Sequence, residues 1–301
     1  MISESKYLSI MKKLDYLTWF MHKNVSREEN ERWLAGVFFN LNGYYPNFKA
    51  PLSFNEKIGW LRLNYCSEDI VRAVDKVEFE SYVAEKVGEG YTAKKYGVYQ
   101  DPMDVKFEIL PQKFVLKSSY SSSSKNILFI TDKSNLDVNK VRYQMSEWLQ
   151  PWNSSAKSFS CWYRDAKPRI LVEELLEDSS GHLKDYKFMC FNGVPKFLFV
   201  ISDRFNGGYA DFFDLDWNHL PVKQKFDNAP FTIERPSGFD RMVELARTLS
   251  KDFLFVRVDF YQIRERVLVG ELTFSPAGGL EPFTPVEWDY KFGEMLSLSV
   301  N

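Results

Sequence analysis

Apolar residues in the first part of the chain recur at the three- and four-residue spacing of amphipathic helices. Ser26 and Ser53 each precede a glutamate by three positions at the start of such a segment, which predicts a capping box at both helix starts. A further helix is expected over residues 75–86, ending near Gly88, because glycine readily adopts the conformation that follows a helix. The pattern therefore predicts a helical region over residues 1–90.

Short runs of β-branched and aromatic residues replace this pattern from residue 97 onward. Strands are expected at 97–99, 114–117, 127–130, 170–176, 187–191, 196–200, 209–215, 255–260 and 267–274. Asn192-Gly193 lies between two of these runs and predicts a tight hairpin. Helices are expected over 135–149, over 239–249 and near the C-terminal end. Strands and helices fall in separate blocks, so the fold class is α+β.

Two boundaries follow from these shifts in pattern. We expect an N-terminal helical region over 1–90, a smaller α+β subdomain over 91–168 and a larger one over 169–301. The composition fits an ordinary globular protein, with 45% hydrophobic and 27% charged residues among 301. The formal net charge is −2 and no long run of one sign occurs, so a nucleic-acid partner is not expected.

Several features bear on localisation. Charged residues interrupt the first segment, which does not fit a signal peptide, and no apolar run approaches the roughly 20 residues that span a bilayer. The three cysteines are far apart and odd in number, which predicts no disulfide framework and favours a reducing compartment. We therefore expect a cytoplasmic protein without a transmembrane segment. Leu8, Met11 and Leu14 share a helix face, which leaves peripheral membrane association open.

A lysine at the end of an apolar strand is the first candidate for chemistry. Lys117 leads directly into a serine-rich loop that ends at Lys125. A lysine in this place suits a phosphate group as a point charge, and the hydroxyls of Ser121, Ser122 and Ser123 suit other phosphate oxygens. A mobile connection of ordinary turn composition is the alternative reading.

Two carboxylates in neighbouring predicted strands are the stronger candidate. Asp259 and Glu271 each interrupt an apolar run, and a buried carboxylate is costly unless it is paired or coordinates a metal. Two such groups on adjacent strands suit Mg²⁺, which prefers oxygen ligands. A buried ion pair of Asp259 with Arg257 or Lys187 is the alternative, and the sequence leaves both open.

Short motifs spread over residues 45–298 carry a family resemblance. They are Ser53-Phe54-Asn55-Glu56-Lys57-Ile58, Val74-Asp75-Lys76, Phe114-Val115-Leu116-Lys117, Val172-Glu173-Glu174-Leu175-Leu176, Asp185-Tyr186-Lys187-Phe188, Phe191-Asn192-Gly193, Val200-Ile201-Ser202-Asp203-Arg204, Phe255-Val256-Arg257-Val258-Asp259, Gly270-Glu271-Leu272-Thr273-Phe274, Glu281-Pro282-Phe283 and Glu287-Trp288-Asp289-Tyr290. In this order they resemble the ATP-grasp superfamily, and specifically its branch named after teichuronopeptide biosynthesis (TupA-like).

The resemblance implies a fold and a cofactor set. Two α+β subdomains would clasp ATP together with Mg²⁺. The implied nucleotide-binding residues are Lys117, Ser121, Ser122, Ser123, Lys125, Glu173, Glu174, Leu175 and Leu176, of which the last four would form the hinge beside adenine and ribose. Asp259, Glu271 and Thr273 would bind the metal. Lys187, Arg257 and Arg204 would act on the γ-phosphate or an acyl phosphate.

Two departures from the branch stand out. The branch usually carries asparagine, histidine and several glycines after the strand lysine, where this chain has Ser118-Ser119-Tyr120-Ser121-Ser122-Ser123-Ser124. Glycine lets the backbone approach a phosphate closely, so its absence bears on turnover. Thr273 stands where many relatives have a metal-binding asparagine.

Three functions are compatible with the sequence. The first is ATP-dependent ligation of a carboxylate to an amine through an acyl phosphate, with a small molecule or a bacterial surface polysaccharide precursor as the substrate that the resemblance implies. The second is glycosyl transfer in polysaccharide assembly, since Asp214-Leu215-Asp216 has the acidic spacing of metal-dependent glycosyltransferases; a hairpin turn explains the same residues. The third is non-catalytic binding of nucleotide or sugar.

Overall fold

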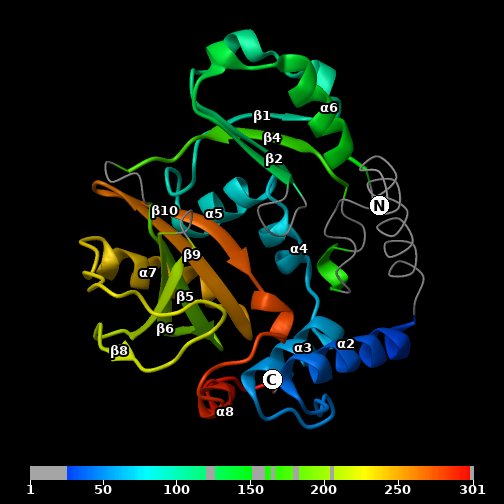
Figure 1. The fold of residues 1–301 in the computed structure, drawn as a ribbon, viewed down its shortest axis with the longest axis vertical. Helices are drawn as coiled ribbons and strands as arrows, with labels where there is room; N and C mark the ends of the chain where they lie inside the picture. The colour runs from blue at the N-terminus through cyan, green and yellow to red at the C-terminus, as the bar shows by residue number, and fades with distance from the viewer. Residues whose placement is uncertain are drawn as a thin grey trace, which may run out of the picture. The chain divides into compact units, whose positions relative to one another are not determined.

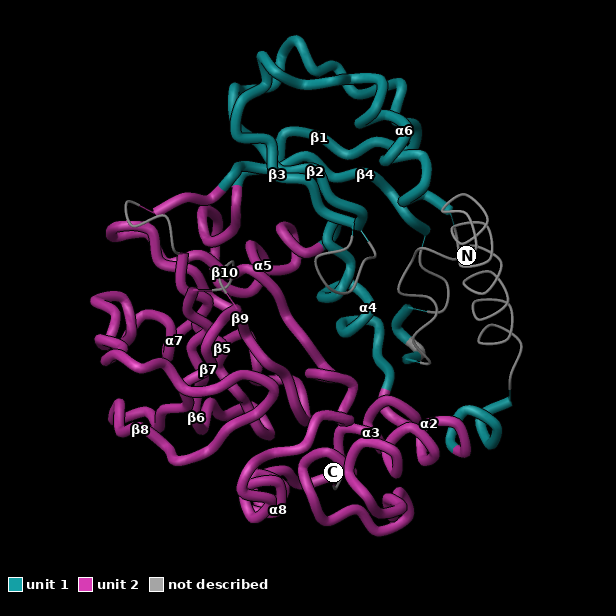
Figure 2. The backbone as a smooth tube through the Cα atoms, in the orientation of Figure 1, with its two compact units in different colours: residues 1–31, 66–78, 94–175 teal, residues 32–65, 79–93, 176–301 magenta. Residues whose placement is uncertain are grey.

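The chain folds into two compact units, each assembled from segments that are not consecutive (Figure 2). The computed structural model describes residues 26–119, 126–150, 160–163, 167–178, 183–203 and 207–298. Unit 1 comprises residues 1–31, 66–78 and 94–175, and unit 2 comprises residues 32–65, 79–93 and 176–301. The chain passes from unit 1 to unit 2 for the last time between Leu175 and Leu176.

Unit 1 is built on a four-stranded antiparallel sheet of order β1-β4-β2-β3. Its strands are β1 (Lys95–Tyr99), β2 (Phe114–Ser118), β3 (Ile127–Ile130) and β4 (Ile170–Glu174). Helix α6 (Val138–Trp148) packs Val141, Met145 and Trp148 into the same core as Leu116 and Ile170. The unit also contains helix α4 (Glu68–Val74) and the short 3-10 turns Pro102–Asp104, Phe107–Ile109, Lys133–Asn135 and Cys161–Tyr163.

Unit 2 is built on a six-stranded antiparallel sheet of order β10-β9-β5-β6-β7-β8 (Figure 1). Its strands are β5 (Asp185–Phe191), β6 (Val194–Ser202), β7 (Tyr209–Asp214), β8 (His219–Leu220), β9 (Phe255–Ile263) and β10 (Arg266–Thr273). The predicted hairpin between β5 and β6 is confirmed. Asn192 and Gly193 have φ angles of 49° and 80°, the positive values that a tight turn requires.

Two sets of helices cover the two faces of this sheet. On one face, Phe239 of α7 (Phe239–Ser250) contacts Phe188 of β5, which also contacts Phe260 of β9. On the other face, one end of the strands packs against α3 (Phe54–Asn64) and α8 (Glu287–Glu294). The unit also contains α5 (Phe79–Val87) and the 3-10 turn η9 (Pro276–Gly279), and α2 (Arg27–Asn42) runs into it.

Both predicted capping boxes are confirmed. Ser53 accepts a hydrogen bond from the backbone of Glu56, whose side chain accepts one from the backbone of Ser53, and the same reciprocal pair joins Ser26 to Glu29 at the start of α2. Each box satisfies two backbone donors that a helix start leaves unpaired. These local sequence signals therefore fix where α2 and α3 begin.

The helix expected over residues 75–86 is wrong in its first part. Helix α4 ends before Asp75, and α5 begins only at Phe79. The Asp75 carboxylate accepts a hydrogen bond from the backbone of Val77 and another from Arg169, so its side chain stabilises a turn instead of a helix. Gly88 ends α5 with a φ angle of 91°, as the sequence predicted.

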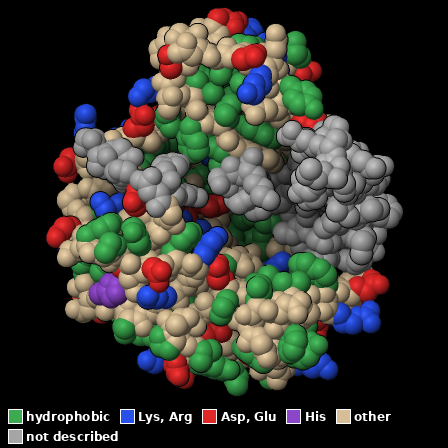
Figure 3. Space-filling view, viewed as in Figure 1, with side chains coloured by type: hydrophobic (Ala, Val, Ile, Leu, Met, Phe, Trp, Pro, Cys, Tyr) green, Lys and Arg blue, Asp and Glu red, His purple; other side chains and the backbone are tan. Residues whose placement is uncertain are grey.

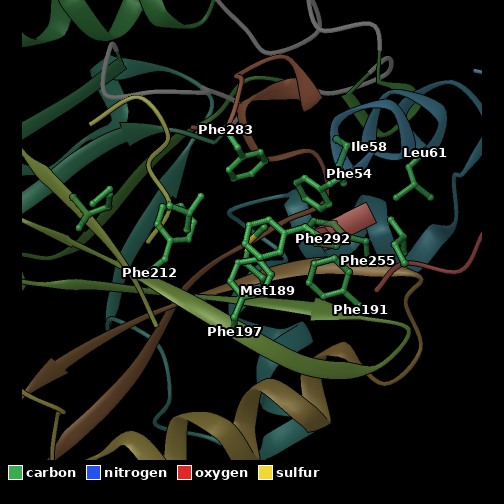
Figure 4. Close-up of a cluster of buried hydrophobic side chains, with 14 residues drawn as sticks. Phe54, Ile58, Leu61, Met189, Phe191, Phe197, Phe212, Phe255, Phe283 and Phe292 are labelled. Carbon is green, nitrogen blue, oxygen red and sulfur yellow. The ribbon is translucent and has the colours of Figure 1, made fainter. Parts of the chain in front are cut away.

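The largest core of unit 2 joins α3 and α8 to the sheet (Figure 4). The ring of Phe54 lies 5.8 Å from that of Phe191 and 5.2 Å from that of Phe255, measured between ring centroids. Phe292 of α8 stacks on Phe197 at 4.0 Å. These aromatic contacts bury large areas of apolar surface, so α3 is a structural part of unit 2.

Two observations bear on the expected localisation. None of the helices in the described residues is long and apolar enough to cross a bilayer. Cys66 is disulfide-bonded, so the expectation that the cysteines form no disulfide is wrong for this residue, whereas Cys190 is free and buried. The cysteines therefore lend no support to a reducing compartment.

Replacing Phe54 with alanine tests the integration of α3. Phe54 is 1% exposed, and we expect Phe54→Ala to lower the free energy of unfolding by about 3–5 kcal/mol, as for other large aromatic truncations in a core. The control is Leu52→Ala, because Leu52 is 68% exposed, and its effect should stay within about 0.5 kcal/mol. Urea denaturation measures both. Equal effects of the two variants would show that α3 does not stabilise unit 2.

Candidate active site

A charged cluster lies on three adjacent strands of the unit 2 sheet. Asp259 on β9 is the cross-strand partner of Lys187 on β5 and of Glu271 on β10, and Arg257 is the partner of Thr273. Directly paired residues on antiparallel strands project from the same face of the sheet. The register therefore gathers five of the predicted site residues on one face.

The Asp259 carboxylate is the centre of this cluster. Arg257 donates to both of its oxygens, from Nε at 2.6 Å and from Nη2 at 2.7 Å, and Lys187 donates to it as well. Arg257 Nη2 also donates to the Thr273 hydroxyl at 3.0 Å and lies 3.9 Å from the Glu271 carboxylate. The ion pairs that the sequence left open for Asp259 are thus present with both cations.

Burial and neighbouring charges shift the pKa of Asp259 in opposite directions. Asp259 is 2% exposed, and burial alone would raise its pKa, but the charges of Arg257 and Lys187 outweigh burial and lower the pKa below its ordinary value. Burial would likewise lower the pKa of Arg257, which Asp259 raises instead. Asp259 is therefore ionised and Arg257 is charged at neutral pH.

Asp185 is a member of the cluster that sequence reasoning did not single out. Its carboxylate lies 2.7 Å from Lys187 Nζ, and burial, the largest influence on the group, raises its pKa although Lys187 opposes the shift. Asp185 precedes Lys187 by two positions in the same strand, so the period-two alternation of a strand places both on one face. That alternation is the signal that could have identified it.

Glu271 differs from the rest of the cluster in its exposure. Its side chain is 53% exposed, against 3% for Asp259 and 14% for Arg257. A carboxylate in this position keeps most of its lone pairs available. The arrangement thus combines one buried, ion-paired carboxylate with one accessible carboxylate on the neighbouring strand.

The nucleotide-binding residues predicted in unit 1 form a second group. Lys117 on β2 makes an ion pair with Glu173 on β4, and the two side chains are 18% and 15% exposed. Glu174 accepts a hydrogen bond from the backbone of Lys94 at 3.2 Å. Leu175 and Leu176 follow β4, at the point where the chain passes from unit 1 to unit 2. The polar partner of Lys117 is thus itself one of the predicted nucleotide contacts.

The backbone at the end of β2 is held by the segment before β4. Ser119 donates its backbone N–H to the Arg169 carbonyl at 2.8 Å, and its hydroxyl accepts from the Arg169 N–H at 2.9 Å. Arg169 in turn pairs with Asp75. These contacts fix the start of the serine-rich segment. Five predicted site residues lie outside the described residues: Ser121, Ser122, Ser123, Lys125 and Arg204.

The acidic pair considered for glycosyl transfer has a local structural role. One Asp214 carboxylate oxygen accepts hydrogen bonds from the backbone N–H groups of Asp216 and Asn218, at 3.0 and 2.8 Å, and the other accepts from the Asn218 side chain. Trp217 between them has a φ angle of 67°. Asp214 therefore stabilises the turn between β7 and β8, as the turn interpretation predicts.

A comparison with protein families gives a match over most of the chain. The model described as TupA-like ATPgrasp matches residues 56–297, which include the charged cluster and Lys117. The chain belongs to the TupA-like ATP-grasp family. The resemblance found in the sequence motifs is confirmed, and with it the α+β fold class. No curated protein matches the chain in sequence.

Solved structures similar to this TupA-like chain include ligases of the ATP-grasp fold. D-alanine–D-alanine ligase from Bacillus anthracis complexed with ATP is 17% identical, with a TM-score of 0.42 over 68% of this chain and 56% of that chain. The same ligase from Helicobacter pylori is 15% identical, with a TM-score of 0.43 over 75% and 61%. The ATP-grasp ligase PsnB with minimal precursor, Mg and ADP is 14% identical, with a TM-score of 0.37 over 69% and 52%. This chain thus spans roughly half to three-fifths of their lengths.

The oxygen ligands in the cluster fit the Mg²⁺ that an ATP-grasp family implies. Asp259 and Glu271 are cross-strand partners, and the Thr273 hydroxyl lies on the same face. The hydrogen bonds from Arg257 and Lys187 occupy three of the roughly four lone-pair sites of the Asp259 carboxylate, so one site is left for a metal. The described residues contain no group of three His, Cys, Asp or Glu side chains arranged for a metal. Two carboxylates are compatible with the usual coordination of Mg²⁺, which keeps several water molecules and takes further oxygens from substrate phosphates.

Exchanging each carboxylate for its amide separates the two roles. Asp259→Asn leaves Arg257 and Lys187 buried without their main counter-charge, so we expect it to lower the free energy of unfolding by about 3–5 kcal/mol. Glu271→Gln alters a half-exposed group and should change stability by no more than about 0.5 kcal/mol. Guanidinium chloride denaturation measures both. Equal free energies of unfolding for Asp259→Asn and Glu271→Gln would contradict the central position of Asp259 in the cluster.

Proposed function

We propose that this chain is an ATP-dependent ligase that joins a carboxylate to an amine through an acyl phosphate. The observation that carries the proposal is the cross-strand cluster of Asp259, Glu271, Arg257 and Lys187 in a chain of the TupA-like ATP-grasp family. It combines oxygen ligands for a divalent cation with two fixed positive charges. Phosphoryl transfer requires this combination, because its catalysis is mainly positioning and charge stabilisation.

Asp259 and Glu271 would bind Mg²⁺, with the Thr273 hydroxyl as a further oxygen. Bound there, Mg²⁺ would neutralise negative charge on the phosphates of ATP. Hydrogen bonds from Arg257 and Lys187 hold Asp259, whereas the exposed Glu271 would complete the coordination. Asp259 would thus be a fixed metal ligand and Glu271 an adaptable one.

Arg257 and Lys187 would stabilise negative charge on the transferred phosphoryl group. Both cations are largely buried, which strengthens their electrostatic effect relative to that of exposed side chains. Their ion pairs with Asp259 and Asp185 hold them in place before the substrate binds. Arg204 remains a third candidate for this role on the family resemblance.

In unit 1, Lys117 would contact a phosphate of ATP. The loop with Ser121, Ser122, Ser123 and Lys125 would cover the phosphates, and Glu173 to Leu176 would lie beside adenine and ribose. The ion pair between Lys117 and Glu173 supports a shared site for both residues within this unit. Lys117 would exchange part of that pairing for a phosphate contact.

The proposed reaction has two steps. A substrate carboxylate oxygen attacks the γ-phosphorus of ATP, the bond to the β-phosphate oxygen breaks, and ADP leaves. The amine then attacks the carbonyl carbon of the acyl phosphate, loses a proton to a base or solvent, and expels inorganic phosphate to leave an amide. The first substrates to test are a uronic acid as the carboxylate and an amino acid as the amine, as the resemblance to the teichuronopeptide branch implies.

Removal of the accessible carboxylate tests the metal assignment. Glu271→Gln should abolish Mg-ATP turnover, measured as ADP release in the presence of a uronic acid and an amino acid, because a neutral amide binds Mg²⁺ poorly. The matched control is Glu244→Gln, since Glu244 is an exposed glutamate on α7 of the same unit, and it should retain the wild-type rate. Wild-type turnover by Glu271→Gln would refute the metal role. ATP binding without turnover in the wild-type protein would favour a non-catalytic role.

Removal of the unit 1 lysine tests the phosphate contact. Mg-ATP at about 100 times its Kd should stabilise the wild-type protein by roughly 2.7 kcal/mol, which thermal unfolding detects. Lys117→Ala should weaken binding by about tenfold to a hundredfold, as expected for the loss of a charged hydrogen bond of about 1.5–3 kcal/mol. Lys140→Ala, an exposed lysine on α6, is the control. Unchanged affinity for ATP in Lys117→Ala would exclude Lys117 from the nucleotide site.

A further inference from the structure

Arg62 is a buried cation of unit 2 without a carboxylate partner. It lies in the last turn of α3 and is 6% exposed, and no carboxylate of the described residues lies within 4.0 Å of its guanidinium. Of the partly buried arginines, Arg257 and Arg169 each pair with an aspartate, whereas Arg142 donates to the Val105 carbonyl. An unpaired buried charge is costly, so the protein retains it at Arg62 for a reason that the fold alone does not supply.

Most of the hydrogen-bonding capacity of Arg62 is unused. Nη1 donates to the carbonyl of Gly278 at 2.7 Å, whereas Nε is buried and has no hydrogen-bond partner among the described residues. Nη2 makes no hydrogen bond to the described residues either. Nε and Nη2 form one edge of the guanidinium, and this is an edge that a carboxylate or phosphate binds through two parallel hydrogen bonds.

Arg62 holds the loop after β10 through its hydrogen bond to Gly278, but this role does not require a charged side chain. Other carbonyls of that loop accept from neutral amides: Leu280 from Asn42 at 3.0 Å, and Glu281 from Asn55 at 2.9 Å. The C-terminal end of α3 favours a cation, but its effective charge is only about half an elementary charge. Burial also lowers the pKa of Arg62 to about 10, and no acidic neighbour opposes this shift.

Arg62 lies against the turn that follows the strand of Glu271. Gly278 and Gly279 belong to the turn η9, which follows β10, the strand of Glu271 and Thr273, and lies against α3 (Figure 1). Both glycines have positive φ angles, and a Cβ atom at Gly279 would lie 2.7 Å from the backbone oxygen of Asn55. A Cβ atom at Gly278 would lie 2.9 Å from Arg62 Nη1. The turn therefore requires glycine where it meets α3 and Arg62.

We propose that Arg62 binds an oxyanion of the substrate other than ATP, a carboxylate or a phosphate, through the edge formed by Nε and Nη2. The identity of that substrate rests on the ligase function proposed above, whereas the binding itself requires no turnover. The oxyanion would supply the missing counter-charge beside the turn that follows the metal-binding strand. On the face drawn in Figure 3 acidic and basic side chains are interspersed, and exposed groups such as Lys223 and Asp227 form ion pairs.

Anion-dependent unfolding without nucleotide tests the proposal. The probes are potassium glucuronate and inorganic phosphate, each compared with potassium chloride at equal ionic strength so that general screening cancels. We expect at least one probe to raise the unfolding midpoint of the wild-type protein in a saturable manner. Arg62→Gln should bind that probe at least tenfold more weakly, whereas the exposed-site control Arg235→Gln should match wild type. The probe that acts identifies the oxyanion as a carboxylate or a phosphate.

A second variant separates binding from a structural role. Arg62→Met removes the buried charge and keeps an apolar stem of similar length, so without probe it should unfold at the same or a higher urea concentration than wild type. If neither Arg62 variant folds, Arg62 is required for folding and the proposal is overturned. A response to neither probe in wild type, or an equal response in wild type and Arg62→Gln, would also overturn it. The affinity for Mg-ATP should stay within twofold of the wild-type value in both variants. A wild-type protein that binds these probes but not Mg-ATP would refute the ligase function and leave anion binding by Arg62 in place.

Discussion

The neutralisation of Asp259 by two cations is the interaction on which the candidate site depends. Asp259 is buried on β9, next to the edge strand of a six-stranded sheet, where a lone carboxylate would be strongly destabilising. Arg257 and Lys187 offset that cost by pairing with the carboxylate, and Asp259 in turn raises the pKa of Arg257. The antiparallel register of β5, β9 and β10 aligns the three side chains with Glu271. The ion pairs of Asp259 thus bring together the metal ligands and the phosphate-binding cations of the proposed function.

Helices α3 and α8 of unit 2 pack on one end of the sheet face that carries the charged cluster. Phe54 of α3 and Phe292 of α8 cover Phe191 and Phe197 at one end of the strands, and α7 covers the opposite face. The charged residues occupy the other end of the face that α3 and α8 share. The same helix α3 also supplies Arg62, so a single element contributes to the core and carries an unpaired cation beside the turn after β10.

Much of this arrangement is predictable from the sequence because its causes are local. Capping boxes, the Asn192-Gly193 turn and period-two alternation each act over a few residues, and the elements that they predict are confirmed. The break at Asp75 was missed because it depends on Arg169, which is distant in the sequence. Arg62 was missed because its significance lies in what surrounds it after folding, whereas Asp185 lies two positions before Lys187 in one strand and could have been identified from that spacing. The pairing of Asp259 with both cations required the strand register, which residue patterns alone do not determine.

Paramagnetic broadening by Mn²⁺ bound with ATP would test the central claim most directly. Mn²⁺ accepts the same hard oxygen ligands as Mg²⁺, and it broadens backbone amide resonances in a distance-dependent manner. The account predicts that broadening in the ternary complex centres on residues 257–259 and 271–273, with Asp214 to Asn218 little affected. Broadening centred on that β7–β8 turn, or absent from the amides around Asp259 and Glu271, would contradict it.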